Sequence, residues 1–357
     1  MDVKLQIHLF ICIICTFIVF CIIPDLPYKG KDFSCYLRLH RVPYLYYPYY
    51  GIILSVITFN RLTVLAVLLL FFNVHACKQP LPQADAKLKI LTTIPPLYSF
   101  TKNITGDLAS VENLLPSGAG PHEYSLSPED VKKVAESRIL IINGVHLEAW
   151  LQRLTGSVEE IRESGHTDKE KLIIVDTSIG VRIIDNDPHI WLSPKNAVIQ
   201  VKNIRDALVK ADPANSELYV KNAAEYIRRL ENLDREIKDE IKTWKSNQFV
   251  AFHPAFKYFA RDYGLKQAAV IQETHEIEPS PKHIADVIET IKSNGIKAIF
   301  TEPQISHKIV KSIADDLNLE VYSLDTLETG SPYKEWYEDR MRSNLAVLKK
   351  ALNRETE

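Results

Sequence analysis

The sequence of 357 residues predicts an α/β protein with two βα lobes, each built on a mainly parallel sheet, joined by one long rigid helix. Two observations predict this architecture. Short β-like runs alternate with helical patterns from Lys87 onward, and the alternation resumes after residue 247, as repeated βα units require. A single unbroken helical pattern separates the two blocks. We therefore expect a first lobe at 88–211, a linking helix at 212–246 and a second lobe at 247–357.

Each block is expected to contain four strands, because it holds four short apolar runs rich in β-branched residues. The first four runs are Leu88–Thr92, Ser110–Leu115, Arg138–Ile142 and Leu172–Asp176. The second four are Phe249–Phe252, Gln267–Ile271, Lys297–Thr301 and Leu319–Leu324. Several helices are expected to begin at a serine cap followed by a proline at the first helical position. These pairs are Ser127-Pro128, Ser193-Pro194 and Ser280-Pro281.

The linking helix opens at Asp212-Pro213 and continues to about Trp244, which corresponds to ~30 residues or ~45 Å. Apolar residues along it recur in steps of three and four, so they form one stripe on the helix surface. Because the stripe is so long, it could pack against both blocks at once and make the helix a stiff spine. Its members are Ala223, Ile227, Leu230, Leu233, Ile237, Ile241 and Trp244.

The amino-terminal segment differs in composition from the rest of the chain. Its first 76 residues carry six basic and three acidic side chains, whereas the remaining residues carry 37 and 42. The run Leu5–Ile23 is about long enough to span a bilayer. A second, shorter run follows Arg61 and ends at Ala76, which predicts a signal peptide at 61–76. Residues 1–60 are expected to be either an over-extended translation start or an additional membrane segment.

Cys77 directly follows the predicted signal peptide and resembles the lipidated cysteine of a bacterial lipoprotein. We expect its thiol to carry a lipid and residues 77–87 to serve as anchor and tether. The alternative is an ordinary signal peptide with a coincidental cysteine. No cysteine follows Cys77, so a disulfide framework or a thiolate metal site in the mature body is excluded. The five cysteines of the chain are Cys12, Cys15, Cys21, Cys35 and Cys77.

Four residues of metal-ligand type follow predicted strands. His122 and His189 lie in loops of the first block, whereas His253 and Asp325 directly follow strands of the second. In open α/β sheets, ligands bind beyond the carboxyl ends of the strands, so these side chains could meet between the lobes. Three imidazoles and a carboxylate suit Zn2+ better than Mg2+ or Ca2+. The alternative for each residue is an ordinary loop position without a ligand role.

Several sequence motifs from Lys87 to Asn353 resemble those of the zinc/manganese ABC-transporter solute-binding proteins. They include Gly-Ala-Gly-Pro-His-Glu-Tyr at 118–124, Asn-Gly-Val-His-Leu-Glu at 143–148, the segment Asp187–Pro194, Phe-His-Pro-Ala-Phe-Lys-Tyr-Phe at 252–259 and Leu-Asp-Thr-Leu at 324–327. The resemblance implies a non-enzymatic extracytoplasmic protein that captures Zn2+ in an interlobe cleft for an ABC importer. It also implies a membrane permease as partner, a monomeric state, and lipid anchoring in the periplasm or at the cell surface.

The resemblance further implies that His122, His189, His253 and Asp325 are the metal ligands, two from each lobe. Manganese-selective relatives tend to carry Glu at the third position, so His253 favours Zn2+ over Mn2+. A Mn2+-binding member of the family and a surface adhesin are the alternatives. A zinc hydrolase would need an open coordination position and a general base, for which Glu123 is the candidate. Glu123 and Asp187 are also candidates to orient the neighbouring ligands.

Overall fold

The computed structural model describes residues 87–122, 124–151, 154, 158, 171–272, 278–303 and 308–353. The chain divides into two units, Met1–Pro82 and Gln83–Glu357, and all described residues belong to the second. The predicted signal peptide, Cys77 and the residues before them lie outside the described part, so the expectations for them stay predictions. Among the described helices, none combines the length and apolarity needed to cross a bilayer.

The first lobe contains a four-stranded parallel sheet with the strand order β2-β1-β3-β4. Its strands are β1 (Leu88–Thr92), β2 (Ala109–Asn113), β3 (Ile139–Ile142) and β4 (Ile173–Asp176). Its helices are α3 (Pro95–Thr105), α4 (Pro128–Glu136) and α6 (Pro194–Ala211), with the short 3-10 helix η1 (Ile190–Leu192) before α6. All four strands lie within two residues of the expected ranges.

The second lobe repeats this arrangement with the equivalent order β6-β5-β7-β8, again entirely parallel. Its strands are β5 (Gln248–Ala251), β6 (Lys266–Val270), β7 (Ala298–Thr301) and β8 (Glu320–Ser323). Its helices are α8 (Lys257–Tyr263), α9 (Pro281–Asn294), α10 (Lys308–Leu317) and α11 (Trp336–Leu352). The predicted fold class of two parallel α/β lobes is therefore confirmed, while the exact lobe boundaries stay predictions.

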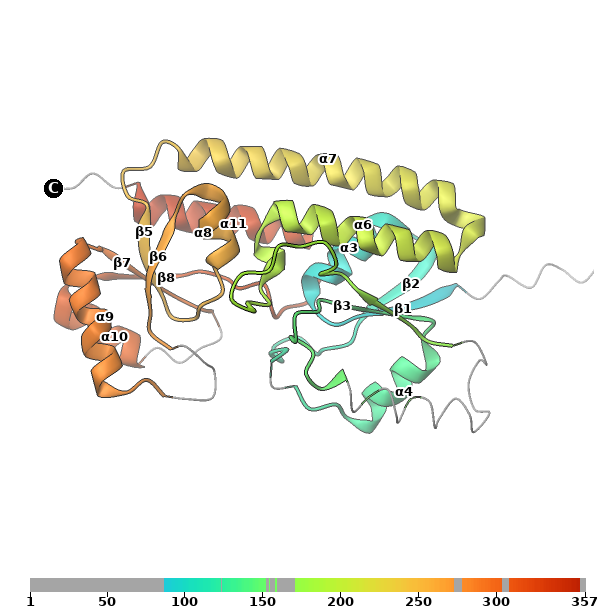
Figure 1. The fold of residues 1–357 in the computed structure, drawn as a ribbon, viewed down its shortest axis with the longest axis horizontal. Helices are drawn as coiled ribbons and strands as arrows, with labels where there is room; N and C mark the ends of the chain where they lie inside the picture. Colours follow the sequence, from blue (N-terminus) through green and yellow to red (C-terminus); the bar gives the residue numbers. More distant parts are fainter. Residues whose placement is uncertain are drawn as a thin grey trace, which may run out of the picture. The chain divides into compact units, whose positions relative to one another are not determined.

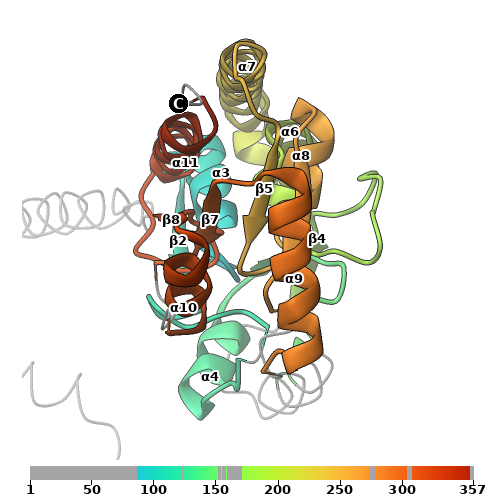
Figure 2. The same cartoon turned by 90° about the vertical axis from the view of Figure 1, so that its left-hand side faces the viewer.

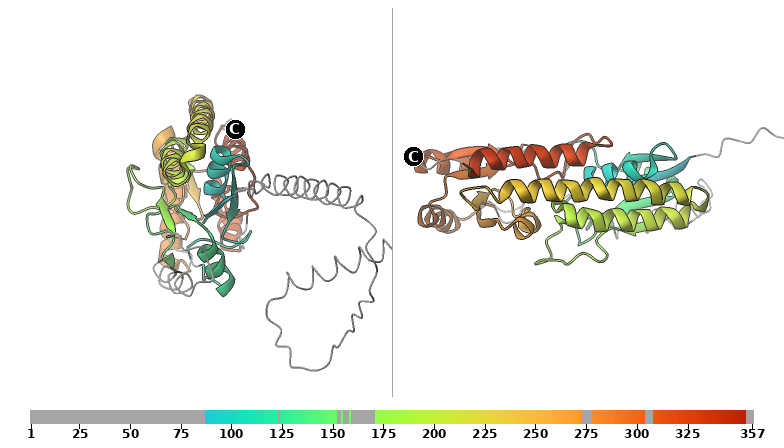
Figure 3. Two further views of the ribbon diagram at one scale, coloured as in Figure 1. Left: turned by 90° about the vertical axis from the view of Figure 1, so that its right-hand side faces the viewer. Right: turned by 90° about the horizontal axis from the view of Figure 1, so that it is seen from above.

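Helix α7 (Ser216–Ile241) joins the lobes and runs along both of them, as Figure 1 shows. Its 26 residues correspond to a length of ~39 Å. A short 3-10 helix, η2 (Pro213–Asn215), precedes it. The view from above in Figure 3 places α6 and α11 on opposite sides of α7, and both contact it. The predicted linking helix is confirmed, although the α-helical part is shorter than expected.

The hydrophobic core explains why the lobes stay together. One large cluster of buried side chains combines the stripe of α7 with residues of α3, α6 and α11 and with one face of each sheet. Along a strand the side chains alternate between faces, so Ile90 joins this cluster and Leu91 a separate cluster on the other face. In Figure 2, α7 and α4 lie at opposite ends of the view, on these two sides of the first sheet. Both faces of the sheet are therefore covered, as parallel sheets require.

The predicted helix caps are present at all three Ser-Pro pairs. The hydroxyl oxygens of Ser127, Ser193 and Ser280 each accept a hydrogen bond from a backbone N–H in the first turn. Each cap satisfies one of the N–H groups that a helix start leaves without a partner. The cap at Ser193 also fixes the point where the loop containing His189 ends and α6 begins.

Candidate metal centre

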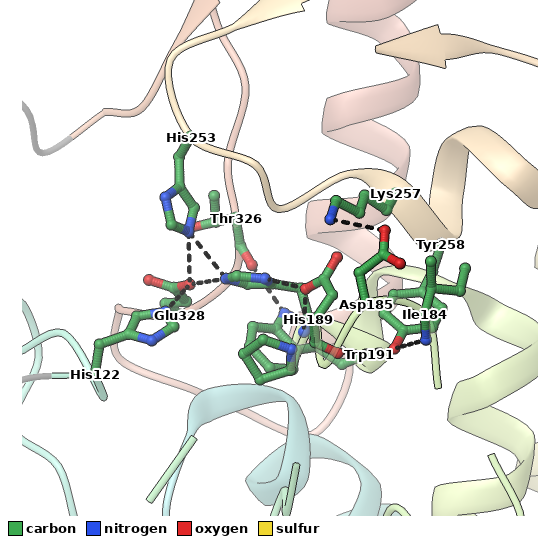
Figure 4. Close-up of polar contacts among 12 residues, drawn as sticks. His122, Ile184, Asp185, His189, Trp191, His253, Lys257, Tyr258, Thr326 and Glu328 are labelled. Atoms are coloured by element: carbon green, nitrogen blue, oxygen red, sulfur yellow. Dashed lines mark hydrogen bonds and ion pairs between the residues drawn. The ribbon is translucent and has the colours of Figure 1, made fainter. Parts of the chain in front are cut away.

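Four side chains from separate segments converge where the two lobes meet (Figure 4). They are His122, His189, His253 and Glu328, and one ligand atom from each lies within 4.8 Å of all the others. The loops that carry them follow β2, β4, β5 and β8, so each lobe contributes two segments at the carboxyl ends of its strands. The structure therefore brings together the three histidines that the sequence singled out.

The ring nitrogens of the three histidines face Glu328 and one another. Glu328 Oε1 lies 2.8 Å from His189 Nε2, 3.2 Å from His122 Nε2 and 4.0 Å from His253 Nε2. The Nε2 atoms of His189 and His253 are 3.0 Å apart. Since every one of these contacts uses Nε2, the imidazoles are oriented with the same nitrogen toward a common point.

Asp187 orients the central imidazole. Its Oδ1 accepts hydrogen bonds from the backbone N–H of His189 at 3.0 Å and from Nδ1 of the same ring at 2.6 Å. A proton held on Nδ1 leaves the lone pair of Nε2 available to a cation, which is how carboxylates support histidine ligands. The supporting role considered for Asp187 in the sequence thus corresponds to an observed contact. Glu123, the other candidate for that role, lies outside the described residues.

The surroundings of Glu328 and His189 lower the pKa of the carboxyl group and raise that of the imidazole. Burial by itself would raise the pKa of Glu328, but hydrogen bonds from His122 and His189 outweigh it and hold that pKa well below its usual range. Burial would likewise lower the pKa of His189, but hydrogen bonds to Asp187 and Glu328 raise it to about 9. The carboxylate of Glu328 is therefore held in its charged form beside His189.

Water reaches the cluster unevenly. The side chain of His122 is 25% exposed, whereas those of His189, His253 and Glu328 are only 3–6% exposed. Buried charges and imidazoles of this kind require partners, because an unpaired buried charge is costly. Here Glu328 is a partner of His122 and His189, and Asp187 is a second partner of His189.

Asp325, the fourth ligand expected from sequence, is not part of the cluster. Its Oδ1 accepts a hydrogen bond from the backbone N–H of Leu327 at 2.8 Å, and its Oδ2 lies 3.9 Å from Nη1 of Arg340. The carboxylate thus folds back onto its own chain, as aspartates do in Asx turns. Glu328 follows three residues later and presents its longer side chain to the histidines instead. The only feature of the sequence that could have pointed to Glu328 is that it is a second carboxylate in the segment of Asp325.

A further buried carboxyl group near the site was missed from sequence. Glu302 follows β7 and is 6% exposed. Its Oε2 accepts a hydrogen bond from the hydroxyl of Thr326 at 3.3 Å, whereas its Oε1 has no hydrogen-bond partner among the described residues. Burial, and secondarily the charge of Glu328, raise the pKa of Glu302 to about 8. The group is therefore mainly protonated below that pH.

The two other histidines that the structure describes are not brought to the site. His146 is exposed on the loop after β3, and His283 lies at the start of α9, where its Nε2 contacts the carbonyl oxygen of Val270 at 2.9 Å. His166, His275 and His307 lie outside the described residues. Within the described part of the chain, the His122 cluster is the one group of side chains suited to hold a metal ion.

Two parallel α/β lobes joined by a helix that packs on both, with a histidine-rich cluster between them, define the chain as a solute-binding protein. It belongs to the family described as zinc-uptake complex component A, periplasmic, whose model matches residues 90–351. The chain is 31% identical over 310 residues to the high-affinity zinc uptake system protein ZnuA of Bacillus subtilis (strain 168). That similarity covers 79% of this chain and 94% of the relative.

Two other relatives show the range of the family. The crystal structure of the Zn(II)-bound ZnuA-like domain of Streptococcus pneumoniae AdcA matches with a TM-score of 0.64 and 32% identity, covering 75% of this chain and all of that domain. The manganese ABC transporter substrate-binding lipoprotein PsaA of Streptococcus pneumoniae is 29% identical over 305 residues, or 80% of this chain and 96% of PsaA. Similar proteins are thus named for zinc and for manganese.

Proposed function

We propose that this chain captures Zn2+ at the junction of its lobes and delivers it to an ABC importer. The observation that carries the proposal is the convergence of three imidazole nitrogens and one carboxylate oxygen within 4.8 Å of one another. Bringing four such donors together from two lobes does not help the protein fold, because it places charge in the interior. A divalent cation bound by these donors would compensate the buried charge of Glu328.

The spacing of the donor atoms supports a tetrahedral zinc ion. Zinc binds nitrogen and oxygen donors at ~2.0–2.1 Å, so the four donors of a tetrahedron lie ~3.3–3.4 Å apart. Four of the six separations between donor atoms are 2.8, 3.0, 3.2 and 4.0 Å, and all six lie within 4.8 Å. Only small side-chain shifts would therefore be needed to accept the ion.

The donor set favours zinc over manganese. Imidazole suits Zn, Cu, Ni and Fe, whereas Mn2+ prefers carboxylate, carbonyl and water oxygens and more of them. With His253 as the third donor, three of the four proposed ligands are nitrogens. His122, His189, His253 and Glu328 are accordingly the ligands we propose, with Glu328 in the place that sequence reasoning gave to Asp325.

The same donor set argues against catalysis. Four protein ligands complete the coordination of a tetrahedral zinc and leave no position for an activated water. Transport is the activity for which relatives are named, including a zinc uptake protein and a manganese ABC transporter lipoprotein. We therefore propose a binding protein for a membrane permease, held outside the cytoplasm by a lipid on Cys77.

Zinc titration of the full chain, purified in detergent, tests the proposal. Competition with a chromophoric chelator should give one tightly bound Zn2+ per chain, and His253→Ala and Glu328→Gln should each lower the affinity strongly. His146→Asn serves as the matched control, because His146 is exposed and its positive φ of 61° suits asparagine. A wild-type chain without stoichiometric zinc, or a His253→Ala variant that binds as tightly as wild type, would contradict the proposal.

A further inference from the structure

The short segment that carries Glu328 has a strained backbone. Leu327 lies immediately before Glu328, is completely buried, and adopts a positive φ of 62°. Side chains other than glycine rarely adopt this left-handed conformation, because Cβ then crowds the following carbonyl oxygen. Such a conformation persists only where surrounding contacts determine it. The contacts around residues 325–328 therefore decide where Glu328 points.

Asp325 supplies the contact nearest to the strained residue. Its Oδ1 accepts a hydrogen bond from the backbone N–H of Leu327 at 2.8 Å. This bond closes a turn around Thr326. The turn lies shortly after the end of β8. Glu328 then leaves the turn toward His122 and His189, as Figure 4 shows for its side chain. The carboxylate of Asp325 is thus engaged in shaping the backbone.

Two side chains from other elements fix the same turn. The side-chain amide of Asn344 on α11, 4% exposed, accepts from the backbone N–H of Asp325 at 2.9 Å and donates to its carbonyl oxygen at 2.7 Å. The indole N–H of Trp191 donates to the carbonyl oxygen of Thr326 at 2.8 Å. Since Trp191 lies two residues after His189, the turn is tied to the loop that carries another proposed ligand.

We propose that Asp325 is a positioning residue that holds Leu327 in the left-handed conformation and so directs Glu328 to the cation. The inference rests on the proposed zinc binding through Glu328. It assigns different tasks to two carboxylates three residues apart, although a ligand role for Asp325 is what the sequence suggests. The second oxygen of Asp325, Oδ2, lies 3.9 Å from Nη1 of Arg340, so this carboxylate has a partner in addition to the Leu327 N–H.

Replacement by asparagine separates the two roles. The amide oxygen of asparagine can accept the Leu327 N–H just as the carboxylate does, so Asp325→Asn retains the turn. A neutral amide is, however, a much poorer zinc ligand than a carboxylate. Asp325→Ala removes the acceptor and frees Leu327 from its conformation. Glu328→Gln keeps the turn and removes the proposed ligand charge.

The test compares these three variants with wild type by zinc titration and by the visible absorption spectrum of the Co2+ form, which reports the ligands directly. Asp325→Asn should keep the wild-type Co2+ spectrum and lose less than the ~10-fold in affinity that a lost supporting residue costs. Asp325→Ala should lose ~10–100-fold. Glu328→Gln should change the spectrum as well as the affinity.

Two results would overturn the inference. One is an Asp325→Asn variant with an altered Co2+ spectrum and an affinity as low as that of Asp325→Ala, since Asp325 would then be a ligand. The other is a folded Asp325→Ala variant that binds zinc like wild type. Failure of the proposed function is distinguishable from both, because wild type itself would then bind neither ion.

Discussion

The hydroxyl of Tyr258 donates a hydrogen bond to the carbonyl oxygen of Asp187 at 2.7 Å and so joins the two lobes beside the candidate metal centre. Tyr258 lies on α8, the helix that follows His253, whereas Asp187 lies in the loop that carries His189. The same hydroxyl accepts the backbone N–H of Ile184 at 3.1 Å. One buried phenol therefore fixes the distance between segments that supply two proposed ligands.

Removing this hydroxyl should weaken both stability and metal binding. Tyr258→Phe leaves a carbonyl and an N–H in the Ile184–Asp187 loop without their partner, which should cost ~1–3 kcal/mol in the free energy of unfolding. Zinc affinity should fall by up to ~10-fold, because His189 loses part of its support. Chemical denaturation and zinc titration measure the two effects. Unchanged values in both would show that the contact carries no energy.

The carboxylate of Asp187 should matter more for zinc than that of its neighbour Asp185. Asp187→Ala removes the acceptor for Nδ1 of His189 and should lower zinc affinity by ~10–100-fold. Asp185→Asn is the matched control, because the Asp185 side chain is 75% exposed and its partner is Lys257 at 3.3 Å. Equal affinities for the two variants would argue against the orienting role of Asp187.

The buried carboxyl of Glu302 should make the metal-free protein less stable as pH rises. Burial first, then the charge of Glu328, raise its pKa from 4.5 to about 8, so the folded state keeps a proton that the unfolded chain has lost. Stability must therefore fall between these two pH values. Glu302→Gln should melt at a higher temperature than wild type, with a difference that grows from pH 5 to pH 8.

Thermal melts in the presence of a chelator check this expectation. The control is Glu289→Gln on the exposed face of α9, which should show no such growth. If the advantage of Glu302→Gln were the same at both pH values, ionisation of Glu302 would not be the cause.

An ion pair with one buried partner ties the linking helix to both lobes. Arg229 on α7 donates to the carboxylate of Glu338 on α11, which is 3% exposed, and to Oδ1 of Asn103 on α3 at 2.9 Å. The hydroxyl of Tyr226 donates to the same carboxylate at 3.2 Å. The three helices are therefore joined by polar contacts as well as by the shared core.

Arg229→Met should destabilise the fold, because the buried carboxylate of Glu338 loses its cation. For a fully buried pair the loss is ~3–5 kcal/mol, and we expect a smaller value here because the Arg229 side chain is 37% exposed. Denaturant unfolding measures it, with the neighbouring exposed Arg228→Met as control. Adding Glu338→Leu should recover part of the loss, and a double variant less stable than Arg229→Met would contradict this account.

Cys77 should determine where the protein resides. Lipidation of its thiol would hold the chain in the membrane fraction of bacterial cells, so Cys77→Ser should move the protein to the soluble extracytoplasmic fraction. Incorporation of a labelled fatty acid into wild type but not into the variant provides the direct measurement. Identical distribution and labelling of both proteins would exclude the lipoprotein interpretation.

Local patterns in the sequence were sufficient to predict the fold. The strands are short apolar runs, and α7 has a long apolar stripe. Both patterns can be recognised from residues that lie close together in the sequence. The stripe was nevertheless incomplete, because Tyr219 and Tyr226 are completely or almost completely buried. Their hydroxyls find partners in Asp212 and Glu338. Such partners are visible only in three dimensions.

The residues of the candidate site could be predicted where their positions follow from the local sequence. The histidines could be selected because each follows a strand end, and Asp187 because it lies two residues from His189. Asp325 and Glu328 could not be told apart in this way, because Asn344 and Trp191 contact the segment between them from distant parts of the chain. Glu302 was missed for the same reason, since its burial results from packing between β7 and the turn after β8.

The uneven access of water to the cluster has a kinetic consequence. Only the His122 side of the four-residue cluster is open to solvent to a substantial degree, with 25% of that side chain exposed. A cation bound there would have to detach from this imidazole before it could meet a water molecule or a competing chelator. The residence time of the ion would then depend in part on how readily the loop after β2 moves His122 away from it.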